Sequence, residues 1–198
     1  MALYTSVVTL LLVMDPLGNV PIFLSVLKSY EPPAQRRIII IEVFIAFLIL
    51  LVFVFFGPHL MKGLNLSASA LSVSGGIILF LIAIKMIFPQ PESKVSSPQE
   101  EPFIVPLAVP LTAGPSALAM VLLFVTQHPD QIMMFFWAVV IASFLFLCIV
   151  LGGNLLLRVL GRRGLVAIER LMGMILTAVA VQMLLTGILH FMHELPAT

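Results

Sequence analysis

Charged residues are scarce in this sequence of 198 residues. Ten lysines and arginines and nine aspartates and glutamates make up 10% of the chain, whereas a soluble domain carries about 25%. The two signs nearly balance at a net charge of +1, so the basic excess of nucleic-acid-binding proteins is absent. The one cysteine, Cys148, has no partner for an intramolecular disulfide. We therefore expect no nucleic-acid partner and no disulfide framework.

Apolar residues take the place of the missing charge. They make up 61% of the chain, and the mean hydropathy is +1.20. A water-soluble fold of this size would have too little polar surface to cover them, so lipid must supply much of the surroundings. The first residues, Met1–Leu12, lack the basic start of a signal peptide and are expected to begin a membrane helix. The predicted fold class is an all-α membrane protein.

Six apolar stretches are long enough to cross a bilayer, which takes roughly 20 helical residues. They are Thr5–Leu27, Ile38–Phe56, Leu66–Phe88, Phe103–Thr126, Ile132–Leu157 and Glu169–His190. Turn and charge signals separate them at Glu31-Pro32-Pro33, Gly57-Pro58, His128-Pro129-Asp130 and Gly161-Arg162-Arg163-Gly164. The remaining polar stretch, Pro89–Glu101, is rich in proline and serine, which predicts a flexible linker.

Basic residues gather on one side of this six-span arrangement. The loops after spans one, three and five carry Lys28, Arg36, Arg37, Lys94, Arg158, Arg162, Arg163 and Arg170. The opposite side carries only Lys62. Because cytoplasmic loops carry the excess of lysine and arginine, we expect both termini to lie on the outer side of the membrane.

Two pairs of motifs repeat in the same order along the chain. Asp15–Pro21 and Val109–Pro115 share the pattern Pro-Leu-x-x-x-Pro, and Gly76–Met86 matches Gly173–Met183 at five positions in register. Three spans in each half make the second half enter the membrane from the opposite side, which is an inverted-topology repeat. The predicted organisation is a 3+3 repeat within one membrane domain: residues 1–88, a cytoplasmic linker over 89–101, and residues 102–198.

Both proline motifs fall near the middle of their spans, about 15 Å along a helix. Each proline removes a backbone donor and clashes with the carbonyl four residues back, so we expect the first and fourth helices to be broken. Half-helix N-termini attract anions and unwound carbonyls attract cations. A zwitterionic amino acid needs one of each. The alternative is a plain kink whose backbone groups are satisfied by neighbouring helices.

A substrate- or ion-binding site is predicted at these motifs. Asp15 is the strongest signal, because a carboxylate at the centre of a span costs about 3 kcal/mol on insertion scales. A compatible alternative is that Asp15 caps the helix beginning at Pro16. Asn19 and Ser116 offer hydrogen bonds to a ligand or across helices. The predicted set is Asp15, Pro16, Gly18, Asn19, Pro21, Thr112, Ala113, Gly114, Pro115 and Ser116.

Other polar residues in the spans are less strongly indicated as members of the binding site. Lys85 and its repeat counterpart Gln182 are secondary site residues, although Lys85 is also placed to extend to the membrane interface. Glu169 adjoins Arg170, which fits a surface ion pair. No cysteine or carboxylate cluster accompanies the histidines, so no metal site is expected.

Three stretches, Met14–Pro21, Ser74–Phe80 and Pro110–Pro115, resemble the MarC family of bacterial inner-membrane proteins. The resemblance extends over essentially the whole chain. It implies six spans in the bacterial inner membrane. It also implies kinship with transporters of small neutral amino acids, some of which move glycine and alanine, and a distant relation to LysE-type exporters.

The function expected first is secondary transport of a small neutral solute, in particular an amino acid. No nucleotide-binding motif is present, so energy would come from a cation gradient of Na⁺ or H⁺ acting through Asp15, with no other cofactor. An exporter of drugs or toxic compounds is the alternative. A membrane-embedded enzyme is less expected, because the spans hold no mid-depth histidine or paired carboxylates, and a structural role has no positive signal. Membrane lipid and a small molecule are the expected partners, and homo-oligomerisation is left open.

Overall fold

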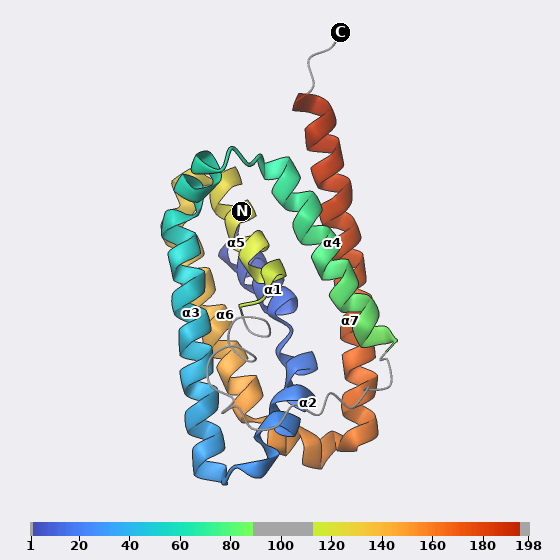
Figure 1. Ribbon diagram of the computed structural model, residues 1–198. Coiled ribbons are helices and arrows are strands. Elements are labelled where there is room, and N and C mark those ends of the chain that lie inside the picture. The colour runs from blue at the N-terminus through green and yellow to red at the C-terminus, as the bar shows by residue number, and fades with distance from the viewer. Residues whose placement is uncertain (1, 89–112, 195–198) are drawn as a thin grey trace.

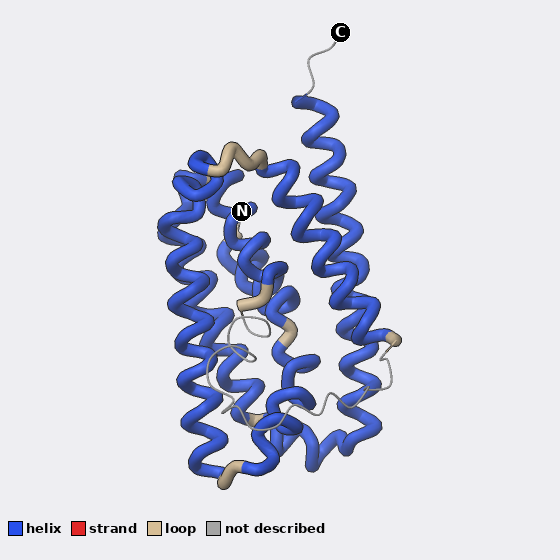
Figure 2. The backbone as a smooth tube through the Cα atoms, in the orientation of Figure 1, coloured by secondary structure: helices blue, strands red, loops and turns tan. Residues whose placement is uncertain are grey.

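The chain is helical throughout the part that the structure, a computed structural model, describes (Figures 1 and 2). The described residues are 2–88 and 113–194. The predicted linker over 89–101 lies outside them, as do the first part of the predicted fourth span and Thr112.

The first span consists of two helices, α1 (Leu3–Met14) and α2 (Pro16–Val26), that meet at Asp15. Asp15 has left-handed backbone angles, φ 46° and ψ 66°. Proline disfavours helical geometry in the residue before it, and aspartate is one of the few residues that adopt the left-handed conformation. The expected break of the first helix is therefore present, but it is confined to one residue. The prediction that Pro21 also interrupts the helix is wrong, because Pro21 lies inside α2.

The next two helices are continuous. A short 3₁₀ turn (Leu27–Ser29) leads into α3 (Pro32–Gly63), which runs through Pro58. The predicted break at Gly57-Pro58 is therefore wrong, and the helix tolerates the proline as membrane helices often do. Helix α4 (Ala68–Ile87) begins with a side-chain cap, in which the Ser67 hydroxyl accepts a hydrogen bond of 3.0 Å from the Ala70 amide.

The described second half begins with a short helix. Helix α5 (Pro115–Gln127) is followed by a 3₁₀ turn (Pro129–Gln131) and by α6 (Ile132–Leu151). Helix α6 ends at Leu151, earlier than the predicted Leu157, because the chain bends at Gly152. Helix α7 (Gly153–Glu194) contains a kink at Gly161, where φ is 65°. That kink lies at the predicted break over residues 161–164.

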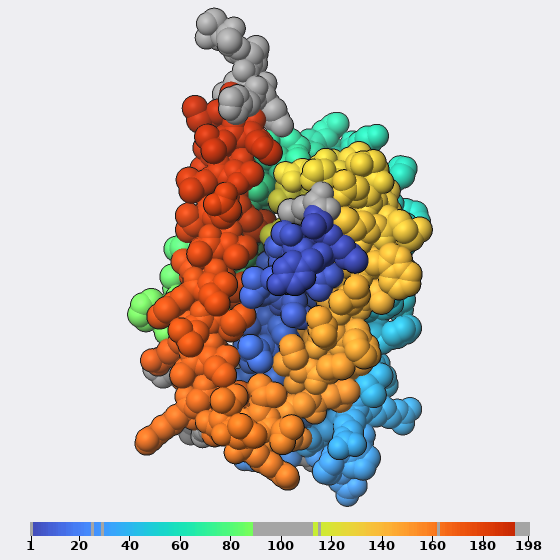
Figure 3. Space-filling model, turned by 180° about the vertical axis from the view of Figure 1, so that it is seen from behind, coloured from blue at the N-terminus to red at the C-terminus, as the bar shows by residue number. Residues whose placement is uncertain are grey.

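The long helices form two antiparallel pairs, α3 with α6 and α4 with α7, and the shorter helices α1, α2 and α5 pack between them (Figure 1). From behind, α1 fills the space between α7 and α6 (Figure 3). Within the described residues, five helical segments are long and apolar enough to cross a membrane, and Ser116–Gln127 is a shorter apolar helix. The protein is thus an all-α membrane protein with a broken helix at its centre.

Candidate functional site

The break between α1 and α2 is held together by its own side chains. The Asp15 carboxylate atom Oδ1 accepts a hydrogen bond of 3.1 Å from the Gly18 amide, which makes Asp15 the N-cap of α2. The Asn19 amide Nδ2 donates to the carbonyl oxygens of Met14 and Asp15, both at 2.9 Å. Carbonyl groups released by the break are therefore satisfied locally, by Asn19. This leaves Asn19 mainly as a support of the break.

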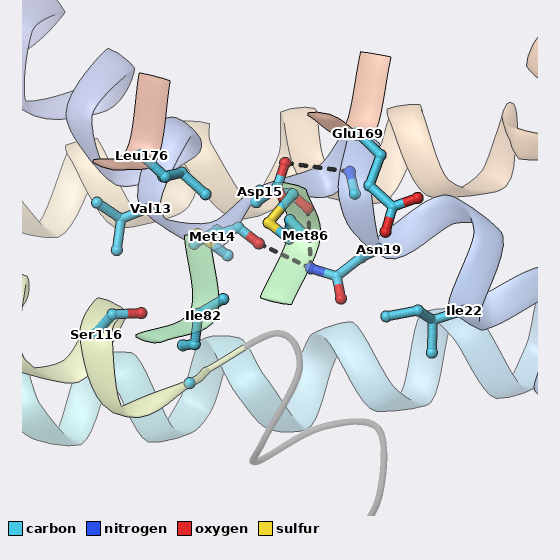
Figure 4. A pocket seen from close by; sticks show the side chains of 12 residues that line it. Val13, Met14, Asp15, Asn19, Ile22, Ile82, Met86, Ser116, Glu169 and Leu176 are labelled. Carbon is cyan, nitrogen blue, oxygen red and sulfur yellow. Dashed lines mark hydrogen bonds between the residues drawn. The ribbon is translucent and has the colours of Figure 1, made fainter. Parts of the chain in front are cut away.

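A cavity of about 180 Å³ opens beside the break (Figure 4). Helices α1, α2, α4 and α7 and the start of α5 all contribute to its wall. The lining residues are Val13, Met14, Asp15, Gly18, Asn19, Ile22, Ile82, Met86, Gly114, Ser116, Glu169 and Leu176. Most of this wall is apolar, so the few polar groups in it determine what the cavity is able to bind.

Asp15 and Ser116 are the most deeply buried polar groups of the wall that keep hydrogen-bonding capacity. Asp15 is 7% exposed and Ser116 is 4% exposed. One carboxylate oxygen of Asp15, Oδ1, is used by the cap of α2. The Asp15 carboxylate and the Ser116 hydroxyl both line the cavity, and they are the kinds of group that orient a ligand in a mostly apolar pocket.

Two half-helices begin at the cavity. Helix α2 is capped by Asp15, whereas the N-cap of α5, Gly114, provides no side-chain hydrogen bond. The start of α5 thus borders the cavity with Gly114 and Ser116, and no side chain of the described residues caps it. A helix N-terminus of this kind attracts an anionic group.

Glu169 supplies a second carboxylate to the cavity, and the sequence interpretation missed it. Its side chain extends from α7 toward the space that Asp15 and Asn19 border (Figure 4). Glu169 is half-buried in the cavity wall while the adjacent Arg170 is exposed, and the two charges interact. The expected surface ion pair with Arg170 stays a prediction, and Glu169 borders the cavity in addition. The sequence signal that could have identified Glu169 was its carboxylate, which lies within the predicted span Glu169–His190.

The structure brings together half of the predicted site. Asp15, Gly18, Asn19, Gly114 and Ser116 line the cavity. Three other described members of the predicted set do not line it: Pro16, Pro21 and Ala113. Pro16 and Pro115 instead begin α2 and α5.

Lys85 and Gln182, the secondary site residues, are exposed and are not among the residues that line the cavity. The Gln182 side chain donates to the Thr186 hydroxyl at 3.2 Å on the same helix.

The absence of a side chain at Gly18 lets the groups of the cavity wall pack closely. A Cβ atom at this position would collide with the Asp15 Oδ2 atom and would lie 2.7 Å from the Met86 methyl group. The Asp15 carboxylate, the Met86 side chain and the α2 backbone therefore meet without room for any side chain at position 18.

These features define an integral membrane protein of packed helices with a mostly apolar cavity, bordered by a few polar groups, at the break of its first span. The chain belongs to the MarC family, because the model of the MarC family integral membrane protein matches residues 1–192. It is 51% identical over 185 residues to a UPF0056 membrane protein of Buchnera aphidicola subsp. Baizongia pistaciae, covering 91% of this chain and 93% of that one. It is 50% identical over 190 residues to the UPF0056 inner membrane protein YhgN of Escherichia coli (strain K12), covering 95% and 96%. No solved structure matches the chain.

Proposed function

We propose that this protein is a secondary transporter of a small neutral solute, and that the solute is an amino acid. The observation that carries the proposal is the cavity that two carboxylates, Asp15 and Glu169, and the start of α5 line together. An intramembrane ionisable residue facing a cavity is typical of ion and substrate pathways. On this proposal the chain is a carrier and not an enzyme.

The polar groups of the cavity match the two charges of an amino acid. On this proposal the Asp15 carboxylate accepts from the ammonium group, and the start of α5 with the Ser116 hydroxyl donates to the carboxylate. Half-helix N-termini bind substrate carboxylates in this way in transporters with broken helices. The apolar wall, from residues such as Ile82 and Leu176, suits a small uncharged side chain.

The size of the cavity favours an amino acid over a drug. Its volume is about 180 Å³, whereas sites for drug-sized ligands occupy roughly 300–1,000 Å³. The second candidate is an exporter of large apolar compounds. It requires the cavity to become larger during transport.

We also propose that the chain has six spans arranged as a 3+3 inverted repeat. Contacts between α4 and α7 support it. A Cβ placed on Gly76 would lie 3.0 Å from the Ala180 carbonyl oxygen, and one placed on Gly173 would lie 3.1 Å from the Ala83 carbonyl oxygen. Gly76 and Gly173 are repeat counterparts, and so are Ala83 and Ala180. A contact from i to j matched by one from j to i is the mark of two-fold symmetry.

The proposed orientation follows from the position of the basic residues. Arg36, Arg37, Arg158 and Arg163 lie near the α2–α3 and α6–α7 junctions, at the lower end in Figure 1, and α1 begins and α7 ends toward the upper end. Because the leaflet facing the cytoplasm attracts basic loops, we place the lower end in the cytoplasm and both termini outside. The E. coli relative is named an inner membrane protein, and we propose that location here. The interface for any homo-oligomer is not specified by this proposal.

Uptake by the purified protein in liposomes tests the proposed function. Labelled glycine, alanine, serine and leucine are offered under an imposed proton or sodium gradient, with protein-free liposomes as the baseline. We expect accumulation of one or more small neutral amino acids that collapses when an ionophore removes the gradient. Drug accumulation without amino-acid accumulation would favour the second candidate, and no transport of either class would contradict a carrier role.

A further inference from the structure

Glu169 is the repeat counterpart of Ser72. It lies four residues before Gly173, and Ser72 lies four residues before Gly76. Because Gly76 and Gly173 are counterparts, the repeat aligns the hydroxyl of Ser72 with the carboxyl of Glu169. The two residues are one turn from equivalent close contacts between α4 and α7.

Ser72 forms a hydrogen bond between these two helices. Its hydroxyl donates to the Met183 carbonyl oxygen at 2.7 Å, and Ser72 is buried. Met183 lies ten residues after Gly173, as Met86 lies ten residues after Gly76. The symmetric acceptor for Glu169 is therefore the carbonyl of Met86. Met86 and Glu169 both line the cavity (Figure 4).

The Met86 carbonyl is well suited to accept such a bond. Helix α4 ends at Ile87, so Met86 belongs to its last turn. The last four carbonyl groups of a helix have no amide donor within that helix. In a membrane, a backbone carbonyl needs a donor from another part of the protein.

A carboxyl group reproduces the serine bond only when it carries a proton. An ionised carboxylate accepts hydrogen bonds and donates none, whereas the protonated form has one O–H donor. We propose that Glu169 is a proton-binding residue that alternates between two positions. When a proton from water forms the O–H bond, the carboxyl donates to the Met86 carbonyl, as Ser72 does to Met183. When the proton returns to water, the carboxylate turns into the cavity beside Asp15. This rests on the proposed function and gives it a coupling ion, H⁺.

The surroundings of Glu169 favour such an exchange. The titratable group that faces it from the break, among the described residues, is Asp15, and the neighbouring cation on its own helix is the exposed Arg170. Helix α4 contributes Met86 and Ile82, which are uncharged. Two like charges in a largely apolar cavity are costly.

Infrared difference spectroscopy tests the proposal without any substrate. Purified protein in liposomes is cycled between acid and alkaline buffer, and the C=O stretch of protonated carboxylic acids is recorded. We expect Glu169→Gln to remove part of this signal. Asp15→Asn should remove a different part. The control Ser72→Ala should leave the signal unchanged and lower the melting temperature, because it loses an interhelical bond without losing a carboxyl group. An unchanged signal in Glu169→Gln would overturn the proposal.

Melting temperatures test the acceptor. Glu169→Gln and Glu169→Ser retain a donor for the Met86 carbonyl, and Glu169→Ala does not. We expect the two donor variants to melt several degrees above Glu169→Ala at every pH. Equal melting temperatures for the three would overturn the bond to Met86. Failure of all amino-acid uptake with a positive infrared result would reject the proposed transport function and leave Glu169 as a proton site.

Discussion

At the scale of single residues, Asp15 combines a structural and a ligand-facing role in one side chain. One carboxylate oxygen caps α2 through the Gly18 amide, and the other borders the cavity. The sequence interpretation treated a cap and a binding role as compatible alternatives, and the geometry accommodates both. Substitutions that separate the two roles are therefore informative.

Asparagine at position 15 keeps the cap and removes the charge. Asn and Asp are nearly equal as N-caps, whereas alanine costs about 1 kcal/mol of stability. We expect Asp15→Asn to melt close to the wild type but to lose gradient-driven uptake, and Asp15→Ala to lose both stability and uptake. Thermal melts and uptake in liposomes measure the two effects. Unchanged gradient dependence in Asp15→Asn would make Asp15 a cap only.

Gly18 offers a way to close the cavity with a single methyl group. In Gly18→Ala the new Cβ must displace the Asp15 carboxylate and the Met86 methyl, so we expect uptake to fall at least tenfold while the protein remains folded. Gly63→Ala is the matched control, because a Cβ there meets nothing within 4 Å. It should leave uptake unchanged and be stabilising by no more than about 1 kcal/mol. Normal uptake by Gly18→Ala would show that this wall is not part of the transport path.

At the scale of helices, the α4–α7 pair is the closest-packed element of the fold. Gly76 and Gly173 face backbone carbonyls of the partner helix at equivalent positions. Small residues allow such close approach between membrane helices. The small residues Ala68, Ser72 and Gly76 are spaced four apart in α4, a spacing that suits close helix packing. Ser72 and Gly76 do face α7.

Equal effects of two distant substitutions would test the symmetry of this pair. Gly76→Ala and Gly173→Ala each force a methyl group against a carbonyl oxygen, and overpacking of this kind costs about 1–3 kcal/mol. We expect the two variants to lower the melting temperature by similar amounts and the double variant to lower it by their sum. A large effect of one and none of the other would contradict the reciprocal packing.

Particular residues explain how far the sequence could predict these elements. The break at Asp15 was predictable because Pro16 acts on the backbone of its neighbour. Pro21 and Pro58 lie inside helices, since tertiary contacts decide whether a proline interrupts a membrane helix. The cavity role of Glu169 was not predictable, because the direction of a side chain depends on how α7 is rotated against α4. The second proline motif differs from the first in that α5 begins at its last proline, Pro115.

At the scale of the whole molecule, the helices divide into a short central group and long outer pairs. Helices α1, α2 and α5 hold the broken segments and the cavity, and α3, α4, α6 and α7 surround them (Figure 1). On the proposed orientation, the end that carries the positive residues faces the cytoplasm.

A fused reporter tests this orientation. An enzyme that is active only outside the cytoplasm, joined after Thr198, should give a strong signal because α7 ends on the outer side in the proposed topology. The same enzyme joined after Glu31, in the loop between α2 and α3, should stay silent. Signal from the fusion after Glu31 and none from the fusion after Thr198 would show that the orientation is the reverse of the proposed one.

The length of α3 links the protein to the thickness of its membrane. Its 32 residues measure about 48 Å along the axis, whereas the hydrocarbon layer of a bilayer is about 30 Å thick. Tilting alone, at the usual 20° or so, leaves α3 longer than that layer. Helices α1 and α5, with 12 and 13 residues, reach only about 18–20 Å. Helix α2 continues α1, however, and the broken segment Leu3–Leu24 has 22 residues, about 33 Å in all, which matches the layer. Acyl-chain length is therefore a variable that acts on α3 and on the broken first span to different degrees.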